Sequence, residues 1–409
     1  MTQNILIRDL EQEDLIWIKE SKPDGVSQND FLKSLLRKAH EEEFSYSLFD
    51  NAVAPHALFG KLPFKFIDLF AGIGGFRCGL TVAGGKCVFT SEWDKYAAIT
   101  YKSWYGDEDV YINDIREIDA ESMIPHHDIL CAGFPCQPFS LAGVSKKKSL
   151  GQAHGFEDAN QGNLFFKIMD IADAKRPPVL FLENVKNLRS HDKGNTWRVI
   201  QSELEKRNYA VFSKILDARY WVPQHRERIF IVCFDKDIFG EESEIDFEFP
   251  EPDKSNGITL KTILSSNPPS KYMLSDKLWK YLQDYAQKHR EKGNGFGFGL
   301  NNEDDVARTM SARYHKDGSE ILIKQKRWRN PRRLTPHEAK YLMGYTDDYA
   351  KLFGHQDGFP QVVSDTQAYR QFGNSVVPKV VEDIAHQIVN VIAETITNQN
   401  SGGLLKSKY

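Results

Sequence analysis

The stretch Phe66-Ile67-Asp68-Leu69-Phe70-Ala71-Gly72-Ile73-Gly74-Gly75 joins an apolar run to a glycine-rich turn. The apolar run predicts a buried strand, and the glycines let the backbone approach a ligand closely at the amino end of a helix. Arg77 occupies the place of the third glycine in a Gly-x-Gly-x-x-Gly turn, which disfavours a pyrophosphate ligand. Glu92 ends the next predicted strand, where a carboxylate can accept both hydroxyls of a ribose. These features are typical of sites for nucleotides and for S-adenosylmethionine.

Beyond this turn, strands alternate with helices as in an α/β fold with a doubly wound, mostly parallel sheet. The predicted strands cover 66–70, 86–92, 128–132, 179–182, 210–217 and 228–234, and the predicted helices include 162–174, 195–207, 336–343 and 378–397. After residue 234 the sequence becomes acidic and rich in Pro and Gly. We therefore expect a catalytic domain at 61–235, a smaller irregular domain at 236–330, a return to the catalytic domain at 331–398 and a tail at 399–409.

A cysteine between two prolines follows the strand predicted at 128–132. In Gly133-Phe134-Pro135-Cys136-Gln137-Pro138-Phe139-Ser140 the prolines restrict the backbone and hold the thiol at a turn. This position suits a nucleophile, although a lone cysteine also serves as a small apolar filler. The polar segment 140–160 that follows is either a loop that closes over a substrate or a solvated connection.

Two other turns carry charged residues that fit a nucleophilic site. Glu183 stands at the carboxyl end of one predicted strand, and Arg226 and Arg228 precede another. Arg228 alone is equally compatible with a structural ion pair. Together, a cysteine, an acid and two arginines can attack a ring and polarise it.

These motifs resemble those of the C5-cytosine DNA methyltransferase family, in the same order, from about residue 65 to 389. They are Phe66 to Gly75, Pro135-Cys136-Gln137, Glu183-Asn184-Val185, Gln224-x-Arg226-x-Arg228 and Phe372-Gly373-Asn374-Ser375-Val376. The resemblance implies a Rossmann-like class I methyltransferase fold and transfer of a methyl group from S-adenosylmethionine to carbon 5 of a flipped-out cytosine in double-stranded DNA.

The resemblance also implies residue roles. Cys136 would add to carbon 6 of cytosine, Glu183 would bond at N3 and the exocyclic amine, Arg226 would hold the O2 side, and Arg228 would belong to the same catalytic set. The cofactor would contact Phe70, Gly72, Gly74, Glu92, Trp93, Asp114, Ile115, Pro135, Leu164, Asn374 and Val376. Within that set Glu92 would hold the ribose and Asp114 would accept from the adenine amino group, whereas Trp93 and Ile115 are also compatible with core packing. No metal is expected.

A basic segment indicates where DNA would bind. Between Val306 and Arg333 there are nine Lys or Arg residues and two acidic ones, although the whole chain has a net charge of −4. Its part from Ser311 to Ile323 looks like the recognition segment of family members that read CCWGG and CCNGG, and arginine is the usual partner of guanine. The expected DNA contacts are Gln137, Ser140, Gln224, Arg313 and Lys316.

The first sixty residues fall outside the resemblance. Their order of strand, helix, turn and capped helix resembles the ribbon-helix-helix fold, a dimeric DNA-binding module. A homodimer through residues 1–60 that binds operator DNA is one interpretation, and a helical extension packed on the catalytic domain is the other.

Composition and competing functions complete the expectations. The chain has 409 residues, 41% of them hydrophobic, and five cysteines without zinc-ligand spacing, and it lacks a membrane-length apolar run or signal peptide. We expect a cytoplasmic bacterial protein associated with the nucleoid through DNA, without disulfides.

Modification in a restriction-modification system is the main hypothesis. A tRNA cytosine-5 methyltransferase and a DNA-binding transcriptional regulator acting through residues 1–60 are the alternatives; the long basic segment favours DNA, and intact Cys136, Glu183 and Arg226 favour an enzyme.

Overall fold

The computed structural model describes residues 64–106, 110–111, 114–135, 164–255, 257–294, 297–326 and 329–406, the last eight of these by their backbone alone. Residues 1–60, for which a ribbon-helix-helix module, a homodimer and operator binding are predicted, therefore lie outside the described residues. So do Cys136, Gln137, Ser140 and the segment 140–160. The expectations for all of them stay predictions.

A seven-stranded sheet organises the catalytic part of the chain, in the order β3-β2-β1-β4-β5-β7-β6. All neighbouring strands are parallel except β7, which is antiparallel to β5 and β6. This is the mostly parallel α/β architecture that the sequence predicts. The strands are β1 (Phe64–Leu69), β2 (Gly85–Ser91), β3 (Val110–Tyr111), β4 (Ile129–Gly133), β5 (Val179–Val185), β6 (Tyr209–Asp217) and β7 (Glu227–Asp235).

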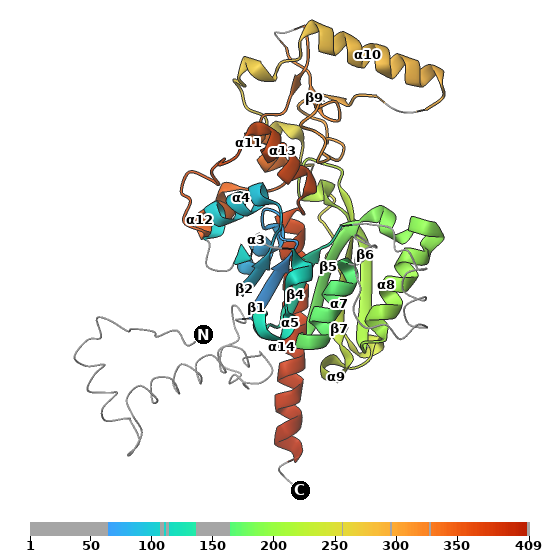
Figure 1. The fold of residues 1–409 in the computed structure, drawn as a ribbon, viewed down its shortest axis with the longest axis vertical. Helices are drawn as coiled ribbons and strands as arrows, with labels where there is room; N and C mark the ends of the chain where they lie inside the picture. The colour runs from blue at the N-terminus through green and yellow to red at the C-terminus, as the bar shows by residue number, and fades with distance from the viewer. Residues whose placement is uncertain are drawn as a thin grey trace, which may run out of the picture.

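Helices cover both faces of the sheet because its strands are apolar on both sides. In β1, Phe66 faces the layer of α3, α4 and α14, and Ile67 faces the layer of α5, α7 and α8. Figure 1 shows α7 and α8 in front of the sheet and the long α14 behind it. The helices are α3 (Gly75–Val82), α4 (Lys95–Tyr105), α5 (Ala120–Met123), α7 (Leu164–Lys175), α8 (Asn195–Glu205), α11 (Pro336–Leu342), α12 (Asp347–Leu352), α13 (Asp365–Asn374) and α14 (Pro378–Lys406).

Sequence patterns missed two features of this domain. β3 has only two residues, too few for an alternating pattern, and its pairing with β2 defines it. α14 continues to Lys406, past the predicted end at 397 and into the expected tail.

Between β7 and α11 the chain forms a separate region, which we call the recognition region (residues 236–333). It contains α9 (Lys236–Phe239), α10 (Asp276–Glu291) and a three-stranded sheet in the order β10-β9-β8. The strands β8 (Leu300–Asn301), β9 (Leu322–Ile323) and β10 (Arg332–Arg333) have two residues each. Figure 1 places α10 and β9 at one end of the molecule, beyond α11 and α13.

No helix in the described part of the chain is long and apolar enough to cross a membrane. The four described cysteines, Cys78, Cys87, Cys131 and Cys233, are buried free thiols.

Candidate active site and cofactor cavity

A cavity of about 480 Å³ opens at the carboxyl ends of β1, β2, β4 and β5. Parallel sheets bind their ligands at this edge because loops from several strands converge there. Most of the predicted cofactor residues line it, together with two of the predicted catalytic residues. The lining includes Phe70, Gly72, Glu92, Trp93, Asp114, Ile115, Pro135, Leu164, Glu183, Arg228 and Asn374.

The glycine-rich turn after β1 forms one wall. Phe70, Gly72 and Gly74 have positive φ angles of 56°, 57° and 78°, so the chain reverses within a few residues before α3 begins. A Cβ atom at Gly72 would meet nothing within 4 Å, which leaves space for a ligand at that residue. A Cβ at Gly74 would instead collide with the Tyr105 ring. Gly72 therefore faces the cavity, whereas Gly74 serves packing in this structure.

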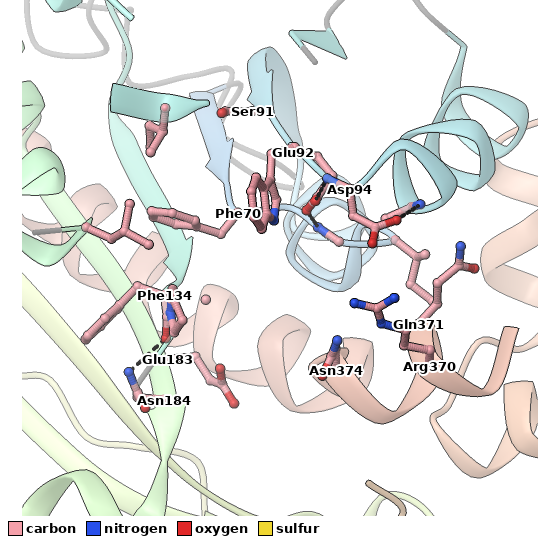
Figure 2. Close-up of a pocket in the computed structure, with 18 of the residues that line it drawn as sticks. Phe70, Ser91, Glu92, Asp94, Phe134, Glu183, Asn184, Arg370, Gln371 and Asn374 are labelled. Carbon is pink, nitrogen blue, oxygen red and sulfur yellow. Dashed lines mark hydrogen bonds between the residues drawn. The ribbon is translucent and has the colours of Figure 1, made fainter. Parts of the chain in front are cut away.

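Glu92 lies at the end of β2 with its carboxylate fixed by backbone groups. The Gly72 N–H donates to Oε2 and the Asp94 N–H donates to Oε1, each at 2.7 Å. Burial raises the pKa of Glu92, and these two hydrogen bonds oppose that shift. Each oxygen has a further lone pair, so the residue fits the predicted ribose contact (Figure 2).

Trp93 and Asp114 occupy the part of the cavity predicted for adenine. Trp93 is 75% exposed, which excludes the core-packing interpretation for it, whereas Ile115 is both buried and part of the lining. Arg116 Nε donates to Asp114 Oδ1 at 2.9 Å, and this hydrogen bond holds the pKa of Asp114 below its usual value. Asp114 is thus an ionised acceptor, as a contact with an amino group requires.

The predicted target-base site combines β5 and β7. Glu183 Oε1 lies 3.0 Å from Arg228 Nε, and both side chains are mostly buried (Figure 2 shows Glu183 beside the cavity). Burial raises the pKa of Glu183, and the charges of Arg228 and Arg226 only partly offset it. A carboxyl group with a raised pKa can be protonated and donate to a ring nitrogen.

The strand register brings the end of β4 to the same place. Gly133 pairs with Glu183, three residues before Cys136 in sequence. Asn184 Nδ2 donates to the Phe134 carbonyl at 2.8 Å and fixes the chain just before Pro135. Asn184 of the Glu183-Asn184-Val185 motif thus joins β5 to the end of β4.

Arg226 and Gln224 lie away from the cavity. Arg226 is 2% exposed and donates to the carbonyls of Met310, Gly373 and Ser375. Gln224 is fully buried, accepts the Met310 N–H and donates to the Leu342 carbonyl. Arg226 lines a small second pocket together with Arg228 and Val376, and Gln224 does not line the main cavity. The contacts of Arg226 with a base and of Gln224 with DNA stay predictions.

Val376 is also outside the main cavity, because its side chain packs beside Gly75. Arg313 and Lys316 are exposed, as DNA contacts must be. Arg116 and three cavity residues on α13, namely Gln367, Arg370 and Gln371, were not predicted from the sequence. Figure 2 labels Arg370 and Gln371. Arg370, Gln371 and Asn374 follow Gln367 by three, four and seven positions, which is the spacing of one helix face.

The sheet order and the cavity at the carboxyl edge of the sheet define the Rossmann-like α/β fold of class I methyltransferases. Among solved structures, the Dnmt2 methyltransferase of S. pombe has a TM-score of 0.59 at 17% identity, covering 82% of this chain and 99% of that one. The likeness shows the shared fold.

Sequence comparisons show the family. The model of the C-5 cytosine-specific DNA methylase family matches residues 64–390. The DNA-cytosine methyltransferase of Escherichia coli K12 is 43% identical over 431 aligned positions, which cover 91% of this chain and 89% of that protein. The type II methyltransferase M.NlaX of Neisseria lactamica is 47% identical, over 80% of this chain and 96% of that protein. The chain belongs to the C-5 cytosine-specific DNA methylase family and is a DNA (cytosine-5-)-methyltransferase.

Proposed function

We propose that the enzyme methylates carbon 5 of a cytosine flipped out of double-stranded DNA, through a covalent adduct between the Cys136 sulfur and carbon 6. The observation that carries this proposal is the Glu183 and Arg228 pair, which lies in the same cavity as Glu92. A base-binding acid and a ribose-binding acid thus share one cavity. A stacked base cannot enter such a space, so the target must leave the helix.

The described residues fit S-adenosylmethionine as the methyl donor. Glu92 offers lone pairs to a ribose, Asp114 offers an ionised acceptor to an amino group, and the exposed Trp93 ring offers a face for stacking. Bound there, the cofactor supplies an electrophilic methyl group.

The protein groups then have defined tasks. The Cys136 thiolate forms a bond to carbon 6 while Glu183 donates to N3, and the electron pair of the 5,6 double bond moves to carbon 5 for methylation. Loss of the proton from carbon 5 to solvent then returns the electron pair to the 5,6 bond and expels the thiolate, and N3 returns its proton to Glu183. Arg228 holds Glu183 in place, and its charge limits the rise in the pKa of Glu183 that burial causes.

A duplex with 5-fluorocytosine at the target tests the covalent step, because fluorine cannot leave as a proton does. Wild-type enzyme with S-adenosylmethionine should form an adduct that survives denaturing electrophoresis. Cys136→Ala is the control and should form none. An equal yield of adduct with Cys136→Ala would refute the assignment.

Calorimetry tests the cofactor proposal. Glu92→Ala should weaken S-adenosylmethionine binding by about 1.5 to 3 kcal/mol through loss of charge-assisted hydrogen bonds. Tight binding of NAD together with no binding of S-adenosylmethionine would contradict it.

The proposed biological role is protection of DNA in a restriction-modification system. The relatives named type II methyltransferases support it. Bisulfite sequencing of DNA from cells that express the enzyme should show one methylated sequence context, and a nuclease that cuts this context should no longer cleave that DNA. Methylation confined to tRNA would refute the proposal.

A further inference from the structure

Arg226 joins two segments that are distant in sequence. It precedes β7 directly, and its Nη1 donates to the Met310 carbonyl at 3.1 Å. Its Nη2 donates to the carbonyls of Gly373 at 3.0 Å and Ser375 at 2.6 Å. Met310 belongs to the recognition region, whereas Gly373 and Ser375 flank the cavity residue Asn374. One guanidinium group therefore binds the residue that precedes the recognition segment (311–323) and the two residues on either side of the cavity residue Asn374.

The chain before Met310 is bound to the chain before Arg226 at several points. The His225 N–H donates to the Ala307 carbonyl at 2.7 Å, and the Met310 N–H donates to Gln224 Oε1 at 2.7 Å. Thr309 Oγ1 donates to the His225 carbonyl at 2.5 Å. The segment 307–310 thus cannot shift without moving the residues that precede β7.

Gly373 adds a direct contact between the same two segments. A Cβ atom there would lie 2.3 Å from the Ala312 nitrogen and 2.3 Å from the Ser311 carbonyl carbon. Only a glycine lets the end of α13 touch the recognition segment backbone to backbone. The exposed Arg313 follows Ala312 immediately, and the cavity residue Asn374 follows Gly373.

We propose that Arg226 is a positioning residue that couples DNA recognition to cofactor binding. The inference rests on the proposed function of the cavity. DNA that binds Arg313 and Lys316 orders residues 310–312, and Arg226 transmits this order to residues 373–375. Two sites that bias one shared element are coupled, and the coupling is reciprocal. Arginine suits the task because its planar fork donates to several carbonyls at once, which the single ammonium group of lysine cannot do.

Coupling is measured as the ratio of two dissociation constants for S-adenosylhomocysteine, which lacks the transferable methyl group and so prevents turnover. Calorimetry gives the constant without DNA and with a duplex that the enzyme methylates. Wild-type enzyme should bind tighter with the duplex by roughly 5- to 150-fold, the usual range for coupled sites. Arg226→Lys should bring this ratio to about one and change the constant without DNA little, because every side chain that lines the cavity remains.

Arg176→Lys is the matched control. Arg176 donates to Asp235, at the other end of β7, and to the Arg207 carbonyl. Loss of its fork alters an arginine whose partners, Asp235, Asp237 and the Arg207 carbonyl, include neither the recognition segment 311–323 nor a residue that lines the cavity, so the ratio should stay at the wild-type value. A scrambled duplex should leave the ratio near one for every protein.

Gly373→Ala tests the same contact from the other side and decides the matter if Arg226→Lys does not fold. Its methyl group pushes residues 311–312 away while Arg226 is intact, so the ratio should again fall. A wild-type ratio in a folded Arg226→Lys protein, or in Gly373→Ala if that is the variant that folds, would overturn the inference. If adduct formation with 5-fluorocytosine is normal at the same time, the proposed function stands and only the coupling role fails.

Discussion

The catalytic sheet and the recognition region are built in different ways. The sheet has strands of up to nine residues that are buried on both faces between helices. The recognition region has three strands of two residues each and a small core of its own around Leu274, Leu282 and Leu322. Its placement depends on the main hydrophobic core, to which Leu260, Met310 and Tyr314 belong. Polar contacts with the catalytic domain, such as those of Gln224, Arg226 and Glu338, add to this packing. The sheet is therefore held by packing around long strands, whereas the recognition region combines packing on the main core with buried hydrogen bonds.

Changing the catalytic acid should have the largest effect. Glu183→Gln keeps the shape and hydrogen-bonding capacity of the side chain but cannot transfer a proton, so kcat should fall by about 10² to 10⁴. DNA affinity measured by fluorescence anisotropy should change little. Glu227→Gln, which loses an exposed ion pair with Lys186, is the control and should keep most of the activity.

The pH profile gives a second test of Glu183. Its pKa is raised, and the protonated form is the one that donates to N3, so wild-type kcat should decline as pH rises through that pKa. A wild-type profile without this decline would contradict the role of Glu183 as an acid.

Breaking the buried ion pair of the recognition region should cost most stability. Glu338 is fully buried, and Arg332 of β10 donates to it twice at 2.7 Å. Glu338→Gln leaves Arg332 without a charged partner and should lower the free energy of unfolding by about 3 to 5 kcal/mol in urea titrations. Asp348→Asn removes an exposed pair with Lys351 and should change it by less than about 1 kcal/mol. Equal effects of the two would mean that the buried pair does not anchor the region.

Removing the charge of Asp68 in β1 should raise the free energy of unfolding, whereas removing the charge of Glu338 should lower it. Asp68 is fully buried, and burial raises its pKa to about 7 despite the Arg77 charge and a hydrogen bond from the Arg77 backbone. The folded state therefore keeps a proton that the unfolded state loses near pH 4, so wild-type stability falls between about pH 4 and 7 and then levels.

Asp68→Asn removes this ionisation. Relative to wild type, the variant should gain stability over the same pH range, by up to about 4 kcal/mol above pH 7, since one pKa unit corresponds to about 1.4 kcal/mol. Urea titrations at pH 5 and pH 8 measure the difference. A gain that does not grow with pH would show that Asp68 is ionised in the folded protein.

Two exposed residues of the recognition region should show the smallest effects. Arg313→Ala should cost about 1 to 3 kcal/mol on the preferred sequence and relax specificity at one base pair. Lys316→Ala should weaken binding to all sequences alike and reduce the salt dependence of binding by about one charge. Competition titrations at several salt concentrations separate the two results. Identical behaviour of both variants would place Arg313 on the phosphate backbone.

The sequence by itself determined the class of fold, the family and the edge of the sheet that carries the cavity. These follow from local signals, because an apolar strand, a glycine turn and a carboxylate at a strand end are readable within a few residues. Glu92 and Glu183 were predicted for this reason, and the structure places both in the cavity.

Only the tertiary structure decided which of two arginines faces the cavity. Arg226 and Arg228 stand two residues apart and look equivalent in sequence. Arg228 meets Glu183, whereas Arg226 meets carbonyls 84, 147 and 149 residues away. The short β3 and the cavity residues Arg370 and Gln371 were missed for the same reason. Their positions depend on contacts between distant segments, which no local pattern of residues records.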